Sequence, residues 1–169
     1  MATLRANRLR LLISSTQAAA SPAEGGGVVQ LDIDERPATG TTNGQWDLHC
    51  GVTYTISASS TENVDLTSLA DPFGGAVAFA EIDAIAIVHM ESSASSSVDL
   101  SPNASNGWTS IFQDASDLTR LLAGQAAIYA DFAAGGGFAV GASNKVLDIV
   151  NNDGANAATV RLYAWGRSA

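Results

Sequence analysis

Hydrophobic and polar residues alternate along this chain in short runs, and turn-forming residues separate the runs. Near the C-terminal end, the runs 145–152 and 158–165 flank a turn-forming segment and together predict a closing β-hairpin. A period of two is typical of a strand that buries one face. In the second run the expected buried face consists of Val160, Leu162 and Ala164, and the opposite face of Thr159, Arg161, Tyr163 and Trp165.

Similar runs follow one another through most of the chain. Further strands are expected at 28–33, 45–48, 52–57, 64–66, 76–80, 82–90, 98–100, 108–112, 125–132 and 138–140. Residues 49–51 read as a break between two of them, and the apolar segment 84–88 is typical of a central strand buried on both faces. Only 114–125 predicts a helical turn, with Asp117 as its cap. No amphipathic segment is long enough for a helical crossover between parallel strands, so the sequence predicts an all-β fold, an antiparallel β-sandwich.

The N-terminal residues differ from the rest and predict an extended arm. Arg5, Arg8 and Arg10 make its start basic, and a Ser-Pro-Ala-Glu-Gly-Gly-Gly segment has the composition of a hinge. We therefore expect two parts, a flexible basic arm and hinge over 1–26 and a single β-sandwich domain over 27–169.

Outside this arm the chain is strongly acidic. Of its 169 residues, 17 are acidic and eight are basic, and three of the eight basic residues stand within the first ten positions. The remaining 159 residues therefore carry five basic and 17 acidic groups, a net charge of −12. Clustered Lys and Arg are needed to neutralise phosphates, so we expect neither nucleic acid nor a membrane surface as a partner.

The N-terminal sequence does not have the apolar core of a secretory signal, and no run approaches the length of a membrane span. The single cysteine, Cys50, permits no intramolecular disulfide, so an oxidising compartment is not indicated. We expect the protein to be made and kept in a cytoplasm.

Residue types suited to catalysis or metal binding are few. Asp47, His49, Cys50 and His89 are of the types that bind zinc, but their spacing matches no zinc motif. A satisfied histidine and a small buried cysteine are the simpler interpretation. A nucleophilic pair of Cys50 and His89 is an alternative that no sequence motif supports. The oxygen-rich segment 151–156 lacks the ligand pattern of a calcium hand and predicts a turn. We therefore expect no catalytic, cofactor-binding or metal-binding residues, and no enzyme.

Aromatic residues offer a different chemistry, because sugar-binding modules stack pyranose rings on exposed Trp and Tyr. Trp46, Trp108, Tyr163 and Trp165 are the candidates, and the last two share one face of the final expected strand. Packing in the core or at a subunit interface is the alternative, since Trp and Tyr are enriched there. We predict Tyr163 and Trp165 as interface aromatics.

A series of short motifs over roughly residues 45–169 resembles small virion structural proteins of tailed bacteriophages. The motifs are Val-Asp-Leu-Thr-Ser-Leu (64–69), Asp-Pro-Phe-Gly (71–74), Ala-Phe-Ala-Glu-Ile-Asp-Ala-Ile (78–85), Ser-Asn-Gly-Trp (105–108), Lys-Val-Leu-Asp-Ile-Val-Asn-Asn (145–152) and Gly-Arg-Ser-Ala (166–169). The resemblance implies a jelly-roll-like β-sandwich, displayed in many copies on a virus particle. The basic first ten residues match nothing in this pattern.

The resemblance also implies a function. We expect a non-enzymatic head decoration or cement protein that binds the major capsid protein, forms a homotrimer and uses no cofactor. It would be made in the host bacterial cytoplasm and reside in the virion. Arg5, Arg8 and Arg10 are the expected capsid or subunit contacts, because a basic arm can reach an acidic neighbouring surface. The alternative is a tail or spike subunit that binds host surface glycans through its aromatic face.

Overall fold

The chain divides into two compact units, a ribbon unit (Met1–Thr39) and a sandwich unit (Gly40–Ala169). The computed structural model describes residues 9–17, 27–35, 38–42, 45–71, 73–91, 96–133 and 136–169. Every regular element within these residues is a β-strand.

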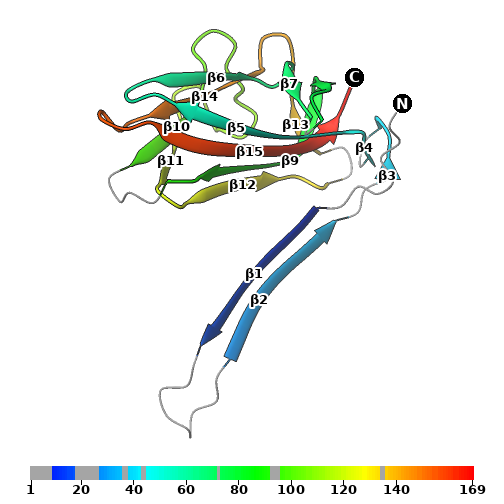
Figure 1. Ribbon diagram of the computed structural model, residues 1–169. Coiled ribbons are helices and arrows are strands. Elements are labelled where there is room, and N and C mark those ends of the chain that lie inside the picture. Colours follow the sequence, from blue (N-terminus) through cyan, green and yellow to red (C-terminus); the bar gives the residue numbers. More distant parts are fainter. Residues whose placement is uncertain are drawn as a thin grey trace, which may run out of the picture. The chain divides into compact units, whose positions relative to one another are not determined.

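Fifteen strands make up this part of the chain (Figure 1). They are β1 (Leu9–Gln17), β2 (Gly27–Glu35), β3 (Ala38–Thr39), β4 (Gln45–Trp46), β5 (Leu48–Ile56), β6 (Thr61–Asp65), β7 (Leu69–Ala70), β8 (Ala76–Val77), β9 (Glu81–His89), β10 (Ser97–Pro102), β11 (Thr119–Leu122), β12 (Ala126–Ala130), β13 (Phe138–Ala139), β14 (Val146–Asn151) and β15 (Ala158–Arg167).

The ribbon unit is built on an antiparallel pair of nine-residue strands, β1 and β2. Their register places Leu11 opposite Ile33 and Ile13 opposite Leu31. The sequence analysis placed the boundary between arm and sandwich at residues 26 and 27. In the structure, residues 27–35 form β2 and pair with β1, so they belong to the ribbon unit. The alternation in 27–35 predicts a strand but does not identify the strand that pairs with it.

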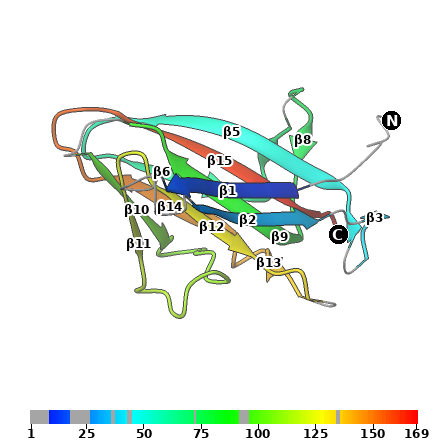
Figure 2. The same cartoon turned by 90° about the horizontal axis from the view of Figure 1, so that it is seen from below.

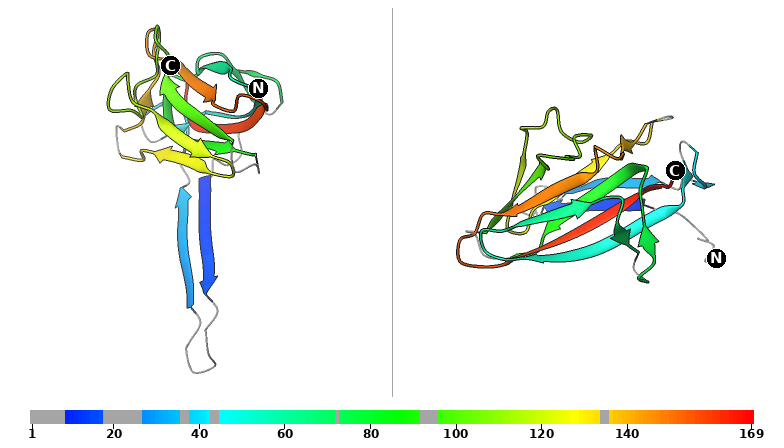
Figure 3. Two further views of the ribbon diagram at one scale, coloured as in Figure 1. Left: turned by 90° about the vertical axis from the view of Figure 1, so that its left-hand side faces the viewer. Right: turned by 90° about the horizontal axis from the view of Figure 1, so that it is seen from above.

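The sandwich unit consists mainly of two antiparallel sheets, as Figures 2 and 3 show from other sides. The larger sheet has the strand order β12-β9-β15-β5, with β13 also paired to β9, and the smaller sheet has the order β11-β10-β14-β6. Pairing is nested along the chain: β5 pairs with β15, β6 with β14, β9 with β12 and β10 with β11. The expected all-β antiparallel sandwich is thereby confirmed.

The core lies between the two sheets, and each main strand contributes alternate residues to it. In β15 the predicted inward residues Val160, Leu162 and Ala164 are fully buried, as are Leu147 and Ile149 of β14. These residues belong to one hydrophobic cluster, whose members range from Cys50 to Ala164 and all lie in the sandwich unit. The sandwich unit therefore has its own hydrophobic core.

The outer face of the smaller sheet is polar. Arg120 of β11 binds Asp99 of β10 through two hydrogen bonds of 2.7 Å each. On the neighbouring strands, Asp148 accepts hydrogen bonds from Asn63 at 2.6 Å and from Asn103 at 3.0 Å. One apolar and one polar face is the usual pattern of an antiparallel sheet that is solvated on one side.

The closing β-hairpin predicted from the sequence does not form. The two runs do form strands, β14 and β15, but β14 pairs with β10 and β6, whereas β15 pairs with β5 and β9. The connecting segment crosses from one sheet to the other. The alternation of residues in a strand predicts which face is buried. It is the same for two strands that pair within a sheet and for two strands that lie in opposite sheets, so it could not identify the pairing.

Three local expectations are also wrong. Residues 114–125 form no helical turn: Asp117 accepts hydrogen bonds from the preceding backbone N–H groups of Gln113 and Asp114, and Thr119–Leu122 forms β11. Residues 108–112 form no strand, and 49–51 do not interrupt β5. At 49–51 and 119–122, pairing with neighbouring strands overrides a weak local preference.

A β-bulge interrupts the pairing of β9 with β15. Trp165 lies opposite Ala84, whereas Gly166 lies opposite Ile82, so β9 contains one extra residue, Asp83. Bulges are common where a sheet redirects a side chain or ends its pairing. Here the bulge places an acidic residue within a strand that is otherwise largely apolar.

We predict that Gly166→Ala destabilises the protein by about 1–3 kcal/mol, the usual cost of overpacking. A Cβ atom at Gly166 would lie 2.0 Å from the carbonyl oxygen of Glu81, which is backbone and cannot move aside alone. The measurement is the free energy of unfolding in urea. Gly141→Ala is the matched control, because a Cβ there meets nothing within 4 Å. Equal stability of both variants would contradict the close approach of the two backbones.

Candidate functional site

The outer face of the larger sheet departs from the usual alternation. Its two neighbouring strands β12 and β9 carry an apolar row, which we define as Ala126, Ile128 and Ala130 of β12 with Val88, Ala86 and Ala84 of β9, paired in that order. Ala84 is buried, and the other five residues are exposed or partly exposed. Ile128 is 47% exposed. Charged and polar residues normally occupy such positions, so this face is suited to contact with another molecule.

The sequence analysis missed this row. It predicted that 84–88 is buried on both faces, whereas the outward residues Ala86 and Val88 are partly exposed. Continuous apolar residues in a strand indicate that both faces avoid water, but they do not show whether the second face is covered by the same chain. The signal available in the sequence for an outward apolar face was the lack of alternating polar residues in both 84–88 and 126–130.

Beside the apolar row, β15 carries an aromatic pair, which we define as Tyr163 and Trp165. Their ring centroids are 6.4 Å apart and the ring planes differ by 20°, so the rings are nearly parallel. Both residues are partly exposed. The predicted outward direction of these two aromatics is therefore confirmed.

The Tyr163 ring lies over the backbone of Gly51 in the neighbouring strand β5. A Cβ atom at Gly51 would be 3.3 Å from Cδ1 and 3.4 Å from Cε1 of Tyr163. The absence of a side chain at Gly51 lets the ring lie close to the sheet. One part of the ring is thus covered by β5 while the residue as a whole stays partly exposed.

Polar residues border the aromatic pair on the same face. Arg161 precedes it on β15 and is exposed, and Thr53 of β5 lies opposite Arg161 and is exposed as well. His49 of β5 lies opposite Trp165. The pair is therefore flanked by hydrogen-bonding groups at both of its ends.

The other two candidate aromatics are structural. Trp46 is 2% exposed and Trp108 is 0% exposed. The Trp108 indole N–H donates to the carbonyl oxygen of Ala139 at 2.9 Å, and its ring packs edge-on against Phe138. Among the three tryptophans, Trp165 alone reaches the surface.

An ion cluster lies at the bulge. Arg167 forms an ion pair with Glu81, and its Nη1 is 3.7 Å from Oδ1 of Asp83. Burial raises the pKa of Asp83 to about 6. The positive charge of Arg167 lowers this pKa, the negative charges of Glu81 and Asp131 raise it, and a hydrogen bond with Trp46 lowers it. Asp83 and Arg167 are buried, and Glu81 is partly exposed.

The residues of the zinc alternative are not brought together. Cys50 lies opposite Ala164 of β15 and His89 lies opposite Val160, so they are four residues apart along that strand, roughly 13 Å. Burial raises the pKa of the Cys50 thiol to about 11. Cys50 is therefore a protonated core residue at neutral pH.

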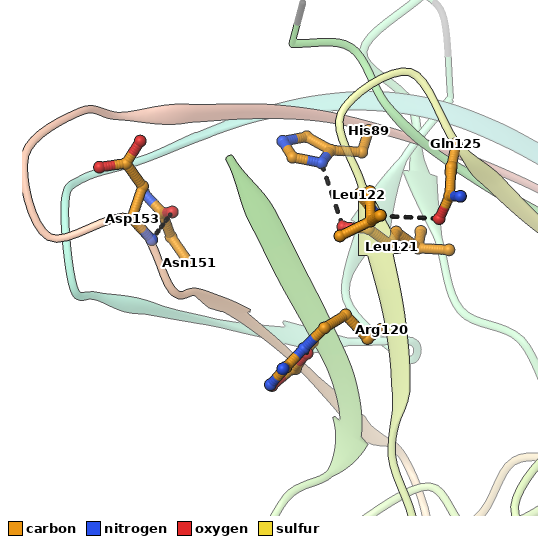
Figure 4. Close-up of polar contacts among 8 residues, drawn as sticks. His89, Arg120, Leu121, Leu122, Gln125, Asn151 and Asp153 are labelled. Carbon is orange, nitrogen blue, oxygen red and sulfur yellow. Dashed lines mark hydrogen bonds and ion pairs between the residues drawn. The ribbon is translucent and has the colours of Figure 1, made fainter. Parts of the chain in front are cut away.

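His89 is buried and hydrogen-bonded, as predicted. It is 0% exposed, and its Nδ1 is 3.3 Å from the carbonyl oxygen of Leu121 (Figure 4). Its Nε2 is 3.1 Å from Oγ of Ser96. These contacts connect β9 of the larger sheet to β11 of the smaller one. The histidine thus serves as a polar link within the core.

The oxygen-rich segment 151–156 forms a connection that satisfies its own polar groups. The Asp153 carboxylate accepts hydrogen bonds from the N–H groups of Ala155 at 2.8 Å and Asn156 at 3.1 Å. The Asn151 side chain accepts from the Asp153 N–H at 2.9 Å (Figure 4) and donates to the carbonyl oxygen of Ile56. Across the described ranges, no group of three or more His, Cys, Asp or Glu residues is arranged to hold a metal ion.

The basic residues predicted as capsid or subunit contacts belong to the ribbon unit. Arg5 and Arg8 lie outside the described residues, and Arg10 lies in β1 opposite Asp34 of β2. Their role in docking stays a prediction.

Comparison with known proteins identifies no relative: no family model, no curated protein and no solved structure matches this chain. Among the residues that the structure describes, no helix is long and apolar enough to cross a membrane.

We predict that Asp83→Asn stabilises the protein at neutral pH but has little effect in acid. The pKa of Asp83 is raised in the folded state, so the native protein binds this proton more tightly than the unfolded chain does. The contribution of Asp83 to the stability of the unsubstituted protein therefore falls as pH rises from about 4 to about 6. The advantage of Asp83→Asn should grow by about 2 kcal/mol between about pH 4 and pH 7.

The measurement is the difference in unfolding free energy between the two proteins across this pH range. Carboxylates with lowered pKa values, such as Asp99 beside Arg120, act in the opposite direction but cancel in the difference. A difference that stays constant with pH would show that Asp83 does not titrate in this window.

Proposed function

We propose that this chain is a non-enzymatic structural subunit of a bacteriophage particle, a head decoration or cement protein that binds the major capsid protein in many copies. The observation that carries the proposal is the division into a β-ribbon unit and a sandwich unit with its own core. The hydrophobic core of the sandwich unit is built from described residues between Cys50 and Ala164, and the proposal assigns the ribbon unit to association with neighbouring subunits.

The ribbon needs further contacts to be stable. An isolated two-stranded antiparallel ribbon is marginal in water, and additional strands or an apolar surface must support it. The register places aliphatic residues at paired positions, with Leu11 opposite Ile33 and Ile13 opposite Leu31. Pairing or packing with neighbouring subunits in a particle would provide that support, in agreement with a homotrimer attached to the shell.

The strand order supports the proposal by analogy of fold. We infer that the sandwich is a jelly roll, since its eight main strands pair in nested order, four of them in each of the two sheets. Jelly rolls are common in viral capsid proteins and in lectins. Fold alone does not determine function, and the apolar row is the surface feature that agrees with contact to a protein neighbour.

We predict that the purified protein binds saturably to phage heads that lack it and does not bind to tails. Cosedimentation with each is the measurement, after light scattering has established whether the protein is a trimer. Replacing Arg5, Arg8 and Arg10 together by Gln should weaken head binding at least tenfold at low salt, because three basic groups would no longer meet an acidic surface.

Salt dependence provides the control for this experiment. Binding of the unsubstituted protein should weaken as salt rises, and binding of the triple variant should depend less on salt. Unchanged affinity of the triple variant would remove the docking role of the arm. Binding to tails alone would favour the alternative, a tail or spike subunit.

A further inference from the structure

We propose that the aromatic pair, Tyr163 and Trp165, is a saccharide-binding platform that stacks neighbouring pyranose rings of one glycan chain. The inference goes beyond the structural role proposed above and does not depend on it. Its basis is the shape and chemistry of the outer face of the larger sheet around β15.

The first argument is the geometry of the two rings. Their planes differ by 20° and their centroids are 6.4 Å apart, so the two nearly parallel rings form an aromatic strip along β15. The C–H bonds on one face of a pyranose ring are apolar and weakly positive, and they complement the electron-rich face of an aromatic ring. Two nearly parallel rings suit two successive sugar units of a chain.

The second argument is the small size of the neighbours. Tyr163 lies between Gly51 of β5 and Ala86 of β9, and Trp165 has Ala84 on its β9 side. Gly51 and Ala86 are small and partly exposed, so they leave the strip open beside Tyr163, whereas Ala84 is buried. Gly51 additionally lets the Tyr163 ring lie close to the backbone, where it is held in place.

The third argument is the placement of hydrogen-bonding groups. Arg161 and Thr53 are exposed at one end of the strip, and His49 lies opposite Trp165 at the other. A few polar groups at the border of an apolar surface are what fixes the orientation of a small ligand. Sugar hydroxyls are both donors and acceptors, so all three side chains can bind them.

The test uses the full-length protein and a panel of soluble polysaccharides built from glucose, mannose, galactose or N-acetylglucosamine units. Affinity electrophoresis measures binding, and intrinsic fluorescence reports on it. Trp46 and Trp108 are fully buried, so quenching by iodide reports mainly on Trp165. We expect retardation by at least one polysaccharide, together with protection of Trp165 from iodide by that polysaccharide.

Substitutions separate ring stacking from general apolar contact. Trp165→Ala and Tyr163→Ala should each weaken binding at least tenfold, Trp165→Phe should retain most of it, and Trp165→Leu should behave like Trp165→Ala. Phe73→Ala is the matched control, because Phe73 is 92% exposed in the β7–β8 connection, which is not part of the larger sheet. It should bind as the unsubstituted protein does.

Circular dichroism and thermal unfolding of each variant establish that it is folded. Absence of binding to every polysaccharide of the panel would overturn the proposal, as would equal binding by folded Trp165→Ala. If the protein is a dimer or trimer and the Trp165→Ala variant is a monomer, the strip is a protein interface, and the saccharide proposal is overturned as well. Head binding is measured separately, so this proposal and the virion proposal can fail independently.

Discussion

The pairing of β15 with both β5 and β9 is the constraint on which the rest of the sandwich unit depends. β15 lies inside the larger sheet, and its register is set on one side by β5 and on the other by β9. Its inward residues Val160, Leu162 and Ala164 are fully buried. A shift of one residue would exchange them with Arg161, Tyr163 and Trp165, so the buried face strongly specifies the register.

The same register creates the candidate site. Once the aliphatic residues of β15 face the core, its aromatic pair must face outward beside Gly51 and the apolar row. The two sheets then differ in their outer faces. The smaller sheet carries paired polar groups such as Asp99 with Arg120, whereas the larger sheet carries alanines, Ile128 and two aromatic rings. This asymmetry points to the larger sheet as the face through which the sandwich meets other molecules.

Polar groups inside the sandwich unit have structural roles. His89 joins the two sheets through Ser96 and Leu121, and Cys50 is a buried thiol. The ion cluster of Arg167, Glu81 and Asp83 sits at a bulge where β9 and β15 change register. Proposals about function therefore rest on surfaces and on the ribbon unit.

The sequence by itself determined the class of the fold and the faces of the strands. Strict alternation in 158–165 predicted which residues of β15 are buried, and the lack of a long amphipathic segment predicted a protein of strands. These features depend on local periodicity, which the sequence contains. The sequence also singled out Tyr163 and Trp165, since residues two apart on a strand share a face.

Only the tertiary structure decided which strands pair. β14 and β15 follow each other in the chain but belong to different sheets, and 27–35 pair with 9–17. The outward apolar row and the bulge at Asp83 likewise arise from contacts between segments far apart in sequence. Partner choice is decided by the joint packing of all strands around one core. The periodicity of a single strand records only that it has a buried face and not what covers it.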